Sequence, residues 1–236
     1  MVVDFLKGYA ILIVYFLVCA STALILRNFL HMPKEVFRKI LHFILLGSIF
    51  IFVYAFNSWW ISKISAIVFM VMVYPVLNYG ESLLDYSDLL IERKKGEIKK
   101  SLIVVFTMFA FLIWICWGIL GQKYLVIASV LAWGVGDAAA ALVGKRFGRH
   151  FIEGRFVEGR KSLEGTIAMF VTSFITVLIV LFIYSPVNQQ AFLPIALVTG
   201  GVSALVELYT RNGMDTLTCP LAAASCMIIF MFFLGV

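Results

Sequence analysis

Residues 133–149 of this 236-residue chain read WGVGDAAAALVGKRFGR and join an apolar segment of helical length to a cluster of positive charge. Asp137 lies inside the apolar part, about 10 Å from the basic exit if the segment is a helix that rises about 1.5 Å per residue. A carboxylate within a membrane-spanning segment costs roughly 2.5 to 3.5 kcal/mol. We therefore interpret Asp137 as a functional residue, and the adjacent positive charge favours metal or phosphate chemistry at a membrane surface.

The whole chain has the composition of a membrane protein. Apolar residues make up 63% of the 236 residues, charged residues make up 14%, and the mean hydropathy is +1.03, far from the values of a soluble domain. A helix needs about 20 apolar residues to cross a hydrocarbon core about 30 Å thick. We predict an all-α fold, a polytopic integral membrane bundle of about eight transmembrane helices that forms one transmembrane domain over residues 1–236. The predicted spans are approximately 5–26, 38–56, 59–79, 101–120, 123–143, 164–184, 190–208 and 217–236.

The basic residues predict the orientation of these spans. All 19 Lys and Arg residues except Lys7, Lys63 and Lys123 fall in the loops after the first, third, fifth and seventh spans. By the positive-inside rule these loops face the cytoplasm and both termini lie outside. The net charge of +6 then reports orientation and anionic surroundings, such as lipid headgroups or a nucleotide. Nothing in the pattern supports binding to nucleic acid.

Two polar patterns accompany the predicted cytoplasmic ends. Thr199, Ser203 and Glu207 recur every four residues and share one helix face, so Glu207 is expected to face the bundle interior. The loop after the third span has an amphipathic pattern that predicts an interfacial helix. Its acidic face is either a solvated surface or a cation site and comprises Glu81, Asp85, Asp88 and Glu92.

A third group of polar residues lies at the start of the second span. Arg38, Lys39 and His42 gather there, and His42 is expected about one turn below the interface. His42 is a candidate for catalysis or ligand contact. The alternative for this end is structural, because Glu35 can form a helix-surface ion pair with Arg38 or Lys39.

The loop at residues 144–164, GKRFGRHFIEGRFVEGRKSLE, concentrates basic residues and glycines ahead of a helix predicted to begin near Ser162. Backbone amides at a helix start, glycines that admit a ligand to the main chain and the Lys161 ammonium group together favour a phosphate site. Positive charge in a cytoplasmic loop also follows from topology alone. The loop is therefore either a phosphate site or only a topological signal.

Taken in order, these residues resemble the CTP-dependent polyprenol kinase family, which contains dolichol kinase, phytol kinase and the yeast-type diacylglycerol kinase. Where the family usually has an Asp-Asn pair in its last motif, this chain has Asp215 between Met214 and Thr216. The elements that carry the resemblance are Arg38-Lys39 with His42 and Gly47, Gly136-Asp137 with Ala138 to Ala141, Gly144-Lys145-Arg146-Phe147-Gly148, Lys161-Ser162-Leu163-Glu164-Gly165-Thr166, Glu207, and Asp215-Thr216-Leu217-Thr218 before Pro220.

The resemblance implies a membrane kinase that transfers the γ-phosphoryl group of CTP to the hydroxyl of a lipid alcohol at the cytoplasmic ends of the helices. The acceptor would be a polyprenol, dolichol or other isoprenoid alcohol, or diacylglycerol. It implies Mg²⁺ held by Asp137 and Asp215, and catalytic roles among Asp137, His42, Glu164 and Glu207. The residues expected around the nucleotide and its phosphates are Arg38, Lys39, Gly144, Lys145, Arg146, Gly148, Lys161, Ser162 and Gly165.

Two other classes of function remain open. Phosphatidate cytidylyltransferases also pair a Gly-Asp helix with a Lys-containing loop, but they close with a longer Arg-Asp-Asp signature that this sequence lacks. Secondary transporters also carry intramembrane carboxylates, which they place near the midplane between repeated halves. The polar groups here gather at one predicted membrane face and no internal repeat is visible, so the kinase is the preferred reading.

Overall fold

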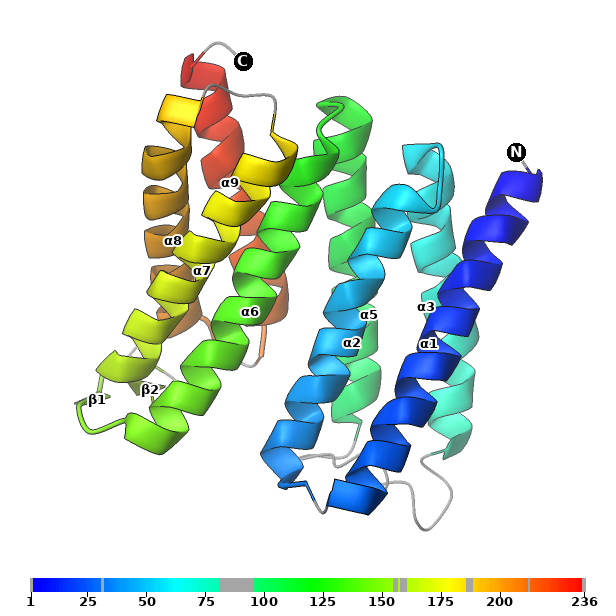
Figure 1. Cartoon of the computed structure of the whole chain (residues 1–236), viewed down its shortest axis with the longest axis horizontal. Helices are drawn as coiled ribbons and strands as arrows, with labels where there is room; N and C mark the ends of the chain where they lie inside the picture. Colours follow the sequence, from blue (N-terminus) through cyan, green and yellow to red (C-terminus); the bar gives the residue numbers. More distant parts are fainter. Residues whose placement is uncertain are drawn as a thin grey trace. The chain divides into compact units, whose positions relative to one another are not determined.

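The computed structural model describes residues 2–30, 32–80, 96–154, 157, 161–185, 189–211 and 213–234. Contacts divide the chain into two compact units, Met1–Ile119 and Leu120–Val236, which are described in turn (Figure 1). Within the described residues, eight helices are long and apolar enough to cross a membrane. Each predicted span coincides with one of them, which confirms an all-α polytopic membrane protein. That all 236 residues form one domain stays a prediction.

The first unit contains four long helices. They are α1 (Val2–Leu30), α2 (Lys34–Tyr54), α3 (Trp59–Gly80) and α5 (Glu97–Leu112), and α5 continues as a π-helical segment, η1 (Ile113–Ile119). Helix α1 packs against α2 and α3, and α3 packs against α5. Buried aromatic rings fill the space between them, with ring centroids 5.9 Å apart for Phe52 and Phe109 and 4.9 Å apart for Phe69 and Phe106. The predicted acidic amphipathic helix after the third span lies outside the described residues.

The second unit contains the predicted basic loop. Its elements are α6 (Lys123–Phe147), β1 (Phe151–Ile152), β2 (Lys161–Ser162), α7 (Leu163–Tyr184), the 3-10 turn η2 (Gln189–Ala191), α8 (Phe192–Tyr209) and α9 (Asp215–Leu234). Helix α6 packs against α7 and α9, and α8 packs against α7 and α9. The two short strands pair in antiparallel fashion with Phe151 opposite Ser162 and Ile152 opposite Lys161. Helix α6 runs further than predicted, so Lys145 and Arg146 belong to its last turn, where positive charge complements the helix dipole.

Small residues bring the helices of the second unit close together. A Cβ atom at Gly136 of α6 would lie 2.5 Å from the Ser173 hydroxyl oxygen of α7, and one at Gly200 of α8 would lie 3.0 Å from the main-chain nitrogen of Phe174. Ser173 Oγ donates a hydrogen bond of 2.8 Å to the main-chain oxygen of Ala132. This packing through small residues and interhelical hydrogen bonds is typical of membrane helices. It fixes how the ends of α6, α7 and α8 lie relative to one another.

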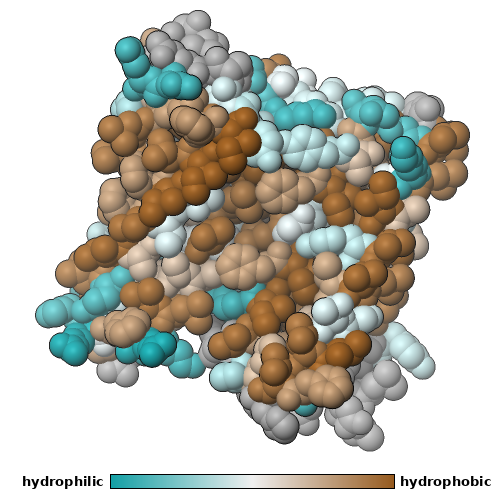
Figure 2. All heavy atoms as spheres, in the orientation of Figure 1, coloured by the Kyte–Doolittle hydropathy of each residue, from teal (hydrophilic) through white to brown (hydrophobic). Residues whose placement is uncertain are grey.

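The outer surface of α7 is apolar along its length. Every fourth residue is exposed, and Figure 2 shows these side chains as a brown diagonal band that ends near hydrophilic side chains at the β1 end. In water such a surface would be unfavourable, whereas in a bilayer it faces lipid chains at no cost. The residues of this face are Ile167, Val171, Ile175, Ile179 and Ile183.

Candidate active site

Charged side chains from four elements of the second unit lie near enough to the start of α9 for their charges to interact. Asp215 is the first residue of α9, Glu207 lies in the last turn of α8, and Asp137 lies in the second half of α6. The charges of Asp137 and Glu207 act on the Asp215 carboxyl, and so does the charge of Lys161 from β2. We call Asp137, Glu207 and Asp215 the carboxylate cluster. The structure thus brings together four residues that the sequence separates by as many as 78 positions.

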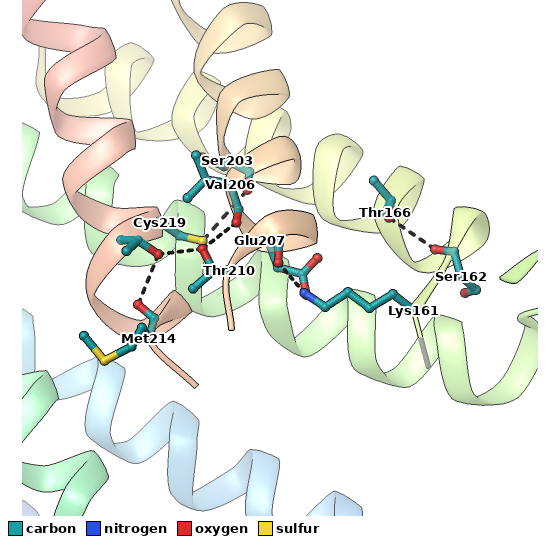
Figure 3. A network of polar contacts seen from close by, with 10 residues as sticks. Lys161, Ser162, Thr166, Ser203, Val206, Glu207, Thr210, Met214 and Cys219 are labelled. Carbon is teal, nitrogen blue, oxygen red and sulfur yellow. Dashed lines mark hydrogen bonds and ion pairs between the residues drawn. The ribbon is translucent and has the colours of Figure 1, made fainter. Parts of the chain in front are cut away.

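Lys161 is held at this cluster by Glu207. Its Nζ atom donates a hydrogen bond of 2.7 Å to Glu207 Oε1 and a second one to the main-chain oxygen of Glu207 (Figure 3). The two side chains are only 20% and 13% exposed. An ammonium group has three donors, so an incoming anion has either to use the third donor or to displace Glu207.

The turn between α8 and α9 is braced by threonines. Thr210 Oγ1 donates to the main-chain oxygen of Val206 at 2.6 Å and lies 2.9 Å from the Thr218 hydroxyl, which bonds the main-chain oxygen of Met214 at 3.1 Å (Figure 3). These bonds connect the end of α8 to the first turns of α9 and therefore hold Glu207 near Asp215. Sequence reasoning missed Thr210. A threonine directly after a predicted helix can bond a helical carbonyl, and this pattern could have identified Thr210 from the sequence.

The glycines around Ser162 lie where the end of α6 packs closely against the start of α7. Ser162 is 4% exposed and caps α7 by accepting a hydrogen bond of 3.2 Å from the main-chain nitrogen of Gly165. A Cβ atom at Gly148 would lie 2.9 Å from Ser162 Oγ, one at Gly144 3.2 Å from the same atom, and one at Gly165 3.0 Å from the main-chain oxygen of Ala140. The glycines thus let the end of α6 contact the start of α7. Phosphate contacts at these four positions stay predictions.

Glu164 binds His150 in the loop that follows α6. Its Oε1 atom lies 2.8 Å from His150 Nδ1, and the main-chain nitrogen of His150 lies 3.2 and 3.4 Å from the two carboxylate oxygens. The main-chain nitrogen of Leu163 donates back to His150 at 2.8 Å. Sequence reasoning missed His150, because a histidine in an irregular loop has no periodic signal. Glu164 therefore has a structural partner, and its predicted contact with the substrate hydroxyl is not tested.

Two further basic residues lie at the same end of α6. Lys145 and Arg146 are exposed, and the Arg146 guanidinium stacks over the Phe147 ring at 5.3 Å. Exposed cations at the mouth of a site raise the local concentration of anions without holding them in one geometry. Both residues suit attraction of a polyphosphate better than its precise placement.

Arg38, Lys39 and His42 belong to α2 in the first unit. Arg38 Nη2 lies 3.2 Å from Glu97 Oε1, which joins α2 to α5. Glu97 is thus one partner of Arg38. The predicted ion pair of Glu35 with Arg38 or Lys39 is not tested, because the Glu35 side chain lies outside the described residues. The His42 ring lies edge-on to the Phe43 ring, with centroids 6.1 Å apart. A part for these residues in the site stays a prediction.

The predicted Mg²⁺ site can be compared with the carboxylates of the second unit. Within the described residues, no group of three or more His, Cys, Asp or Glu side chains lies closely enough to hold a metal unaided. Mg²⁺ does not require such a group, because it is usually bound by one or two carboxylates together with substrate phosphates and water. Asp137 and Asp215, whose like charges interact, have the carboxylate chemistry of such a pair, and their binding of Mg²⁺ stays a prediction.

Comparison with known proteins finds a kinase that is similar to part of this chain. No protein-family model matches the chain. Phytol kinase from Synechocystis sp. is 43% identical to it over 100 residues, which cover 40% of this chain and 39% of that protein. The chain therefore matches about two fifths of the length of this curated relative. Over that part, the similarity confirms the resemblance to the polyprenol kinase family, to which phytol kinase belongs.

Proposed function

We propose that this chain is an integral-membrane kinase that transfers the γ-phosphoryl group of CTP, with Mg²⁺ as cofactor, to the hydroxyl of an isoprenoid alcohol. The observation that carries this proposal is the Lys161–Glu207 contact at 2.7 Å, with Asp137 and Asp215 near enough for their charges to interact with it. The similarity to a phytol kinase supports an isoprenoid alcohol as the class of acceptor.

Phosphoryl transfer mainly needs positioning of the reactants and neutralisation of charge. Asp137 and Asp215 would hold the Mg²⁺ ion, which when bound supplies positive charge to the phosphate oxygens. Lys161 would bind the triphosphate through its ammonium group, and Lys145 and Arg146 would attract it to the site.

Glu207 is the described carboxylate best placed to accept the proton of the alcohol. It is released from Lys161 when a phosphate oxygen takes its place on the ammonium group. The hydroxyl proton then passes to Glu207 as the oxygen bonds to the γ-phosphorus and the bond between that phosphorus and the bridging oxygen of CDP breaks. His42 remains a second candidate for orienting the alcohol. The basic residues predict that Glu207 lies at the cytoplasmic end of its helix.

A labelled-nucleotide assay tests the proposal. Purified protein in liposomes is incubated with Mg²⁺ and γ-labelled CTP or ATP, and phytol, geranylgeraniol, dolichol or diacylglycerol is supplied in turn. We expect the label in a phosphorylated isoprenoid alcohol, with CTP preferred over ATP. Incorporation from α-labelled CTP with release of pyrophosphate would instead show a cytidylyltransferase. No lipid product with any acceptor or nucleotide would overturn the proposal.

A further inference from the structure

We propose that Glu164 and His150 form a brace that positions Lys161 for the nucleotide. The inference rests on the proposed kinase function and assigns His150, which no motif marks, to the working of the site. Glu164 is then a positioning residue that acts through the loop, and it does not take the proton from the alcohol.

In the brace, hydrogen bonds connect His150 in the loop after α6 with Leu163 and Glu164 in the first turn of α7. The Glu164 carboxylate receives the main-chain N–H of His150 and lies 2.8 Å from the His150 ring nitrogen Nδ1, while the N–H of Leu163 donates to the main-chain oxygen of His150 at 2.8 Å. Charge-assisted hydrogen bonds of this kind are stronger than neutral ones. The loop after α6 is therefore attached to the first turn of α7 by hydrogen bonds of both the main chain and the side chain of His150.

The brace holds the loop directly before β1, the strand that pairs with Lys161 of β2. Directly after His150, the chain forms β1, in which Phe151 and Ile152 pair with Ser162 and Lys161 of β2. Ser162 is itself held as the cap of α7. The main chain of Lys161 is thus placed between the cap and β1, and its side chain leaves from there toward Glu207 (Figure 3).

The geometry argues against Glu164 as a base. A general base has to lie within hydrogen-bond reach of the proton that it removes. Both oxygens of Glu164 already lie 3.2 and 3.4 Å from the His150 amide, and the ring of His150, which is 77% exposed, covers one of them. Glu207, in contrast, bonds Lys161, the residue proposed to bind the nucleotide, and is released when the phosphate binds.

Steady-state kinetics of Glu164→Gln, His150→Ala and the double variant test the brace. We expect each change to raise the KM for CTP about three- to tenfold, with kcat within about twofold of the parent, because a loosened loop weakens nucleotide placement and leaves the chemistry intact. The double variant should be no worse than either single variant, since both break the same contact. His150→Asn keeps a donor near the Nδ1 position and should restore most of the affinity. Glu153→Gln, an exposed carboxylate of the same loop, is the matched control and should be silent.

Three results would overturn the brace. A loss of about a hundredfold or more in kcat for Glu164→Gln, with His150→Ala normal, would show that Glu164 acts in the chemistry. Additive losses in the double variant would show that the two residues act separately, and an unchanged KM in both single variants would show that the contact has no role. If Glu164→Gln does not fold, the exposed His150 variants still decide the question. A parent protein without kinase activity would overturn the proposed function instead.

Discussion

Replacing Lys161 by Met should separate the structural role of this residue from its role toward the nucleotide. The Lys161–Glu207 pair is 2.7 Å long and its side chains are 20% and 13% exposed, so it is partly shielded from water. Opposite charges about 4 Å apart attract by about 4 kcal/mol at an effective dielectric constant of about 20, and desolvation offsets much of this. Exposed ion pairs contribute about 0–1 kcal/mol to stability, and breaking a buried pair costs about 3–5 kcal/mol. Because this pair is partly exposed, we expect Lys161→Met to lower the free energy of unfolding by roughly 1–3 kcal/mol.

For a chain of this size, that loss lowers Tm by about 2–12 °C. The KM for CTP should rise roughly 10- to 100-fold, because a charge-assisted contact to phosphate contributes about 1.5–3 kcal/mol. The double variant Lys161→Met with Glu207→Gln should recover most of the stability, because no unpaired charge remains. It should not recover nucleotide use.

Thermal unfolding in detergent and CTP kinetics on the same preparations measure both effects. Lys123→Met, the same substitution at the opposite end of α6, is the control and should leave the KM for CTP unchanged. A double variant with parental KM and kcat would refute the reasoning, because Lys161 and Glu207 would then form only a structural pair. A single variant with normal Tm would refute the magnitude assigned to the pair.

Three further outcomes are expected. Asp137→Asn should lower turnover by a few orders of magnitude without lowering Tm, because the amide is cheaper to bury than a carboxylate and cannot replace its charge toward Mg²⁺; near-normal turnover per folded molecule would exclude the metal role. Arg211→Cys, in a background without the four native cysteines, should be modified only from the cytoplasmic side, and labelling from outside intact cells would reverse the orientation. Gly200→Val should destabilise the second unit by about 1–3 kcal/mol, since a Cβ atom there would lie 3.0 Å from the main chain of Phe174, and an unchanged Tm would contradict this packing.

The sequence alone determined the fold class, and it named the candidate residues of the site. Membrane-spanning backbone has to satisfy its hydrogen bonds internally, so the length and spacing of apolar runs predict helices without knowledge of their partners. The same logic singled out Asp137 and Glu207, because carboxylates within such runs are costly and therefore mark function, whereas Asp215 was named only by the family resemblance. Ser162 was also correctly placed at the start of a helix, since hydroxyl side chains favour that position.

Only the tertiary structure decided which side chains meet. Lys161 contacts Glu207 across 46 positions, and Arg38 contacts Glu97 across 59, because such pairs depend on the rotation and axial offset of packed helices. Apolar periodicity constrains neither quantity closely. The same applies to Glu164, whose partner lies in an irregular loop, and to Gly165, whose missing side chain admits a neighbouring helix. A residue type and its spacing limit the chemistry available, whereas the crossing of α6, α7, α8 and α9 selects the partner that each side chain reaches.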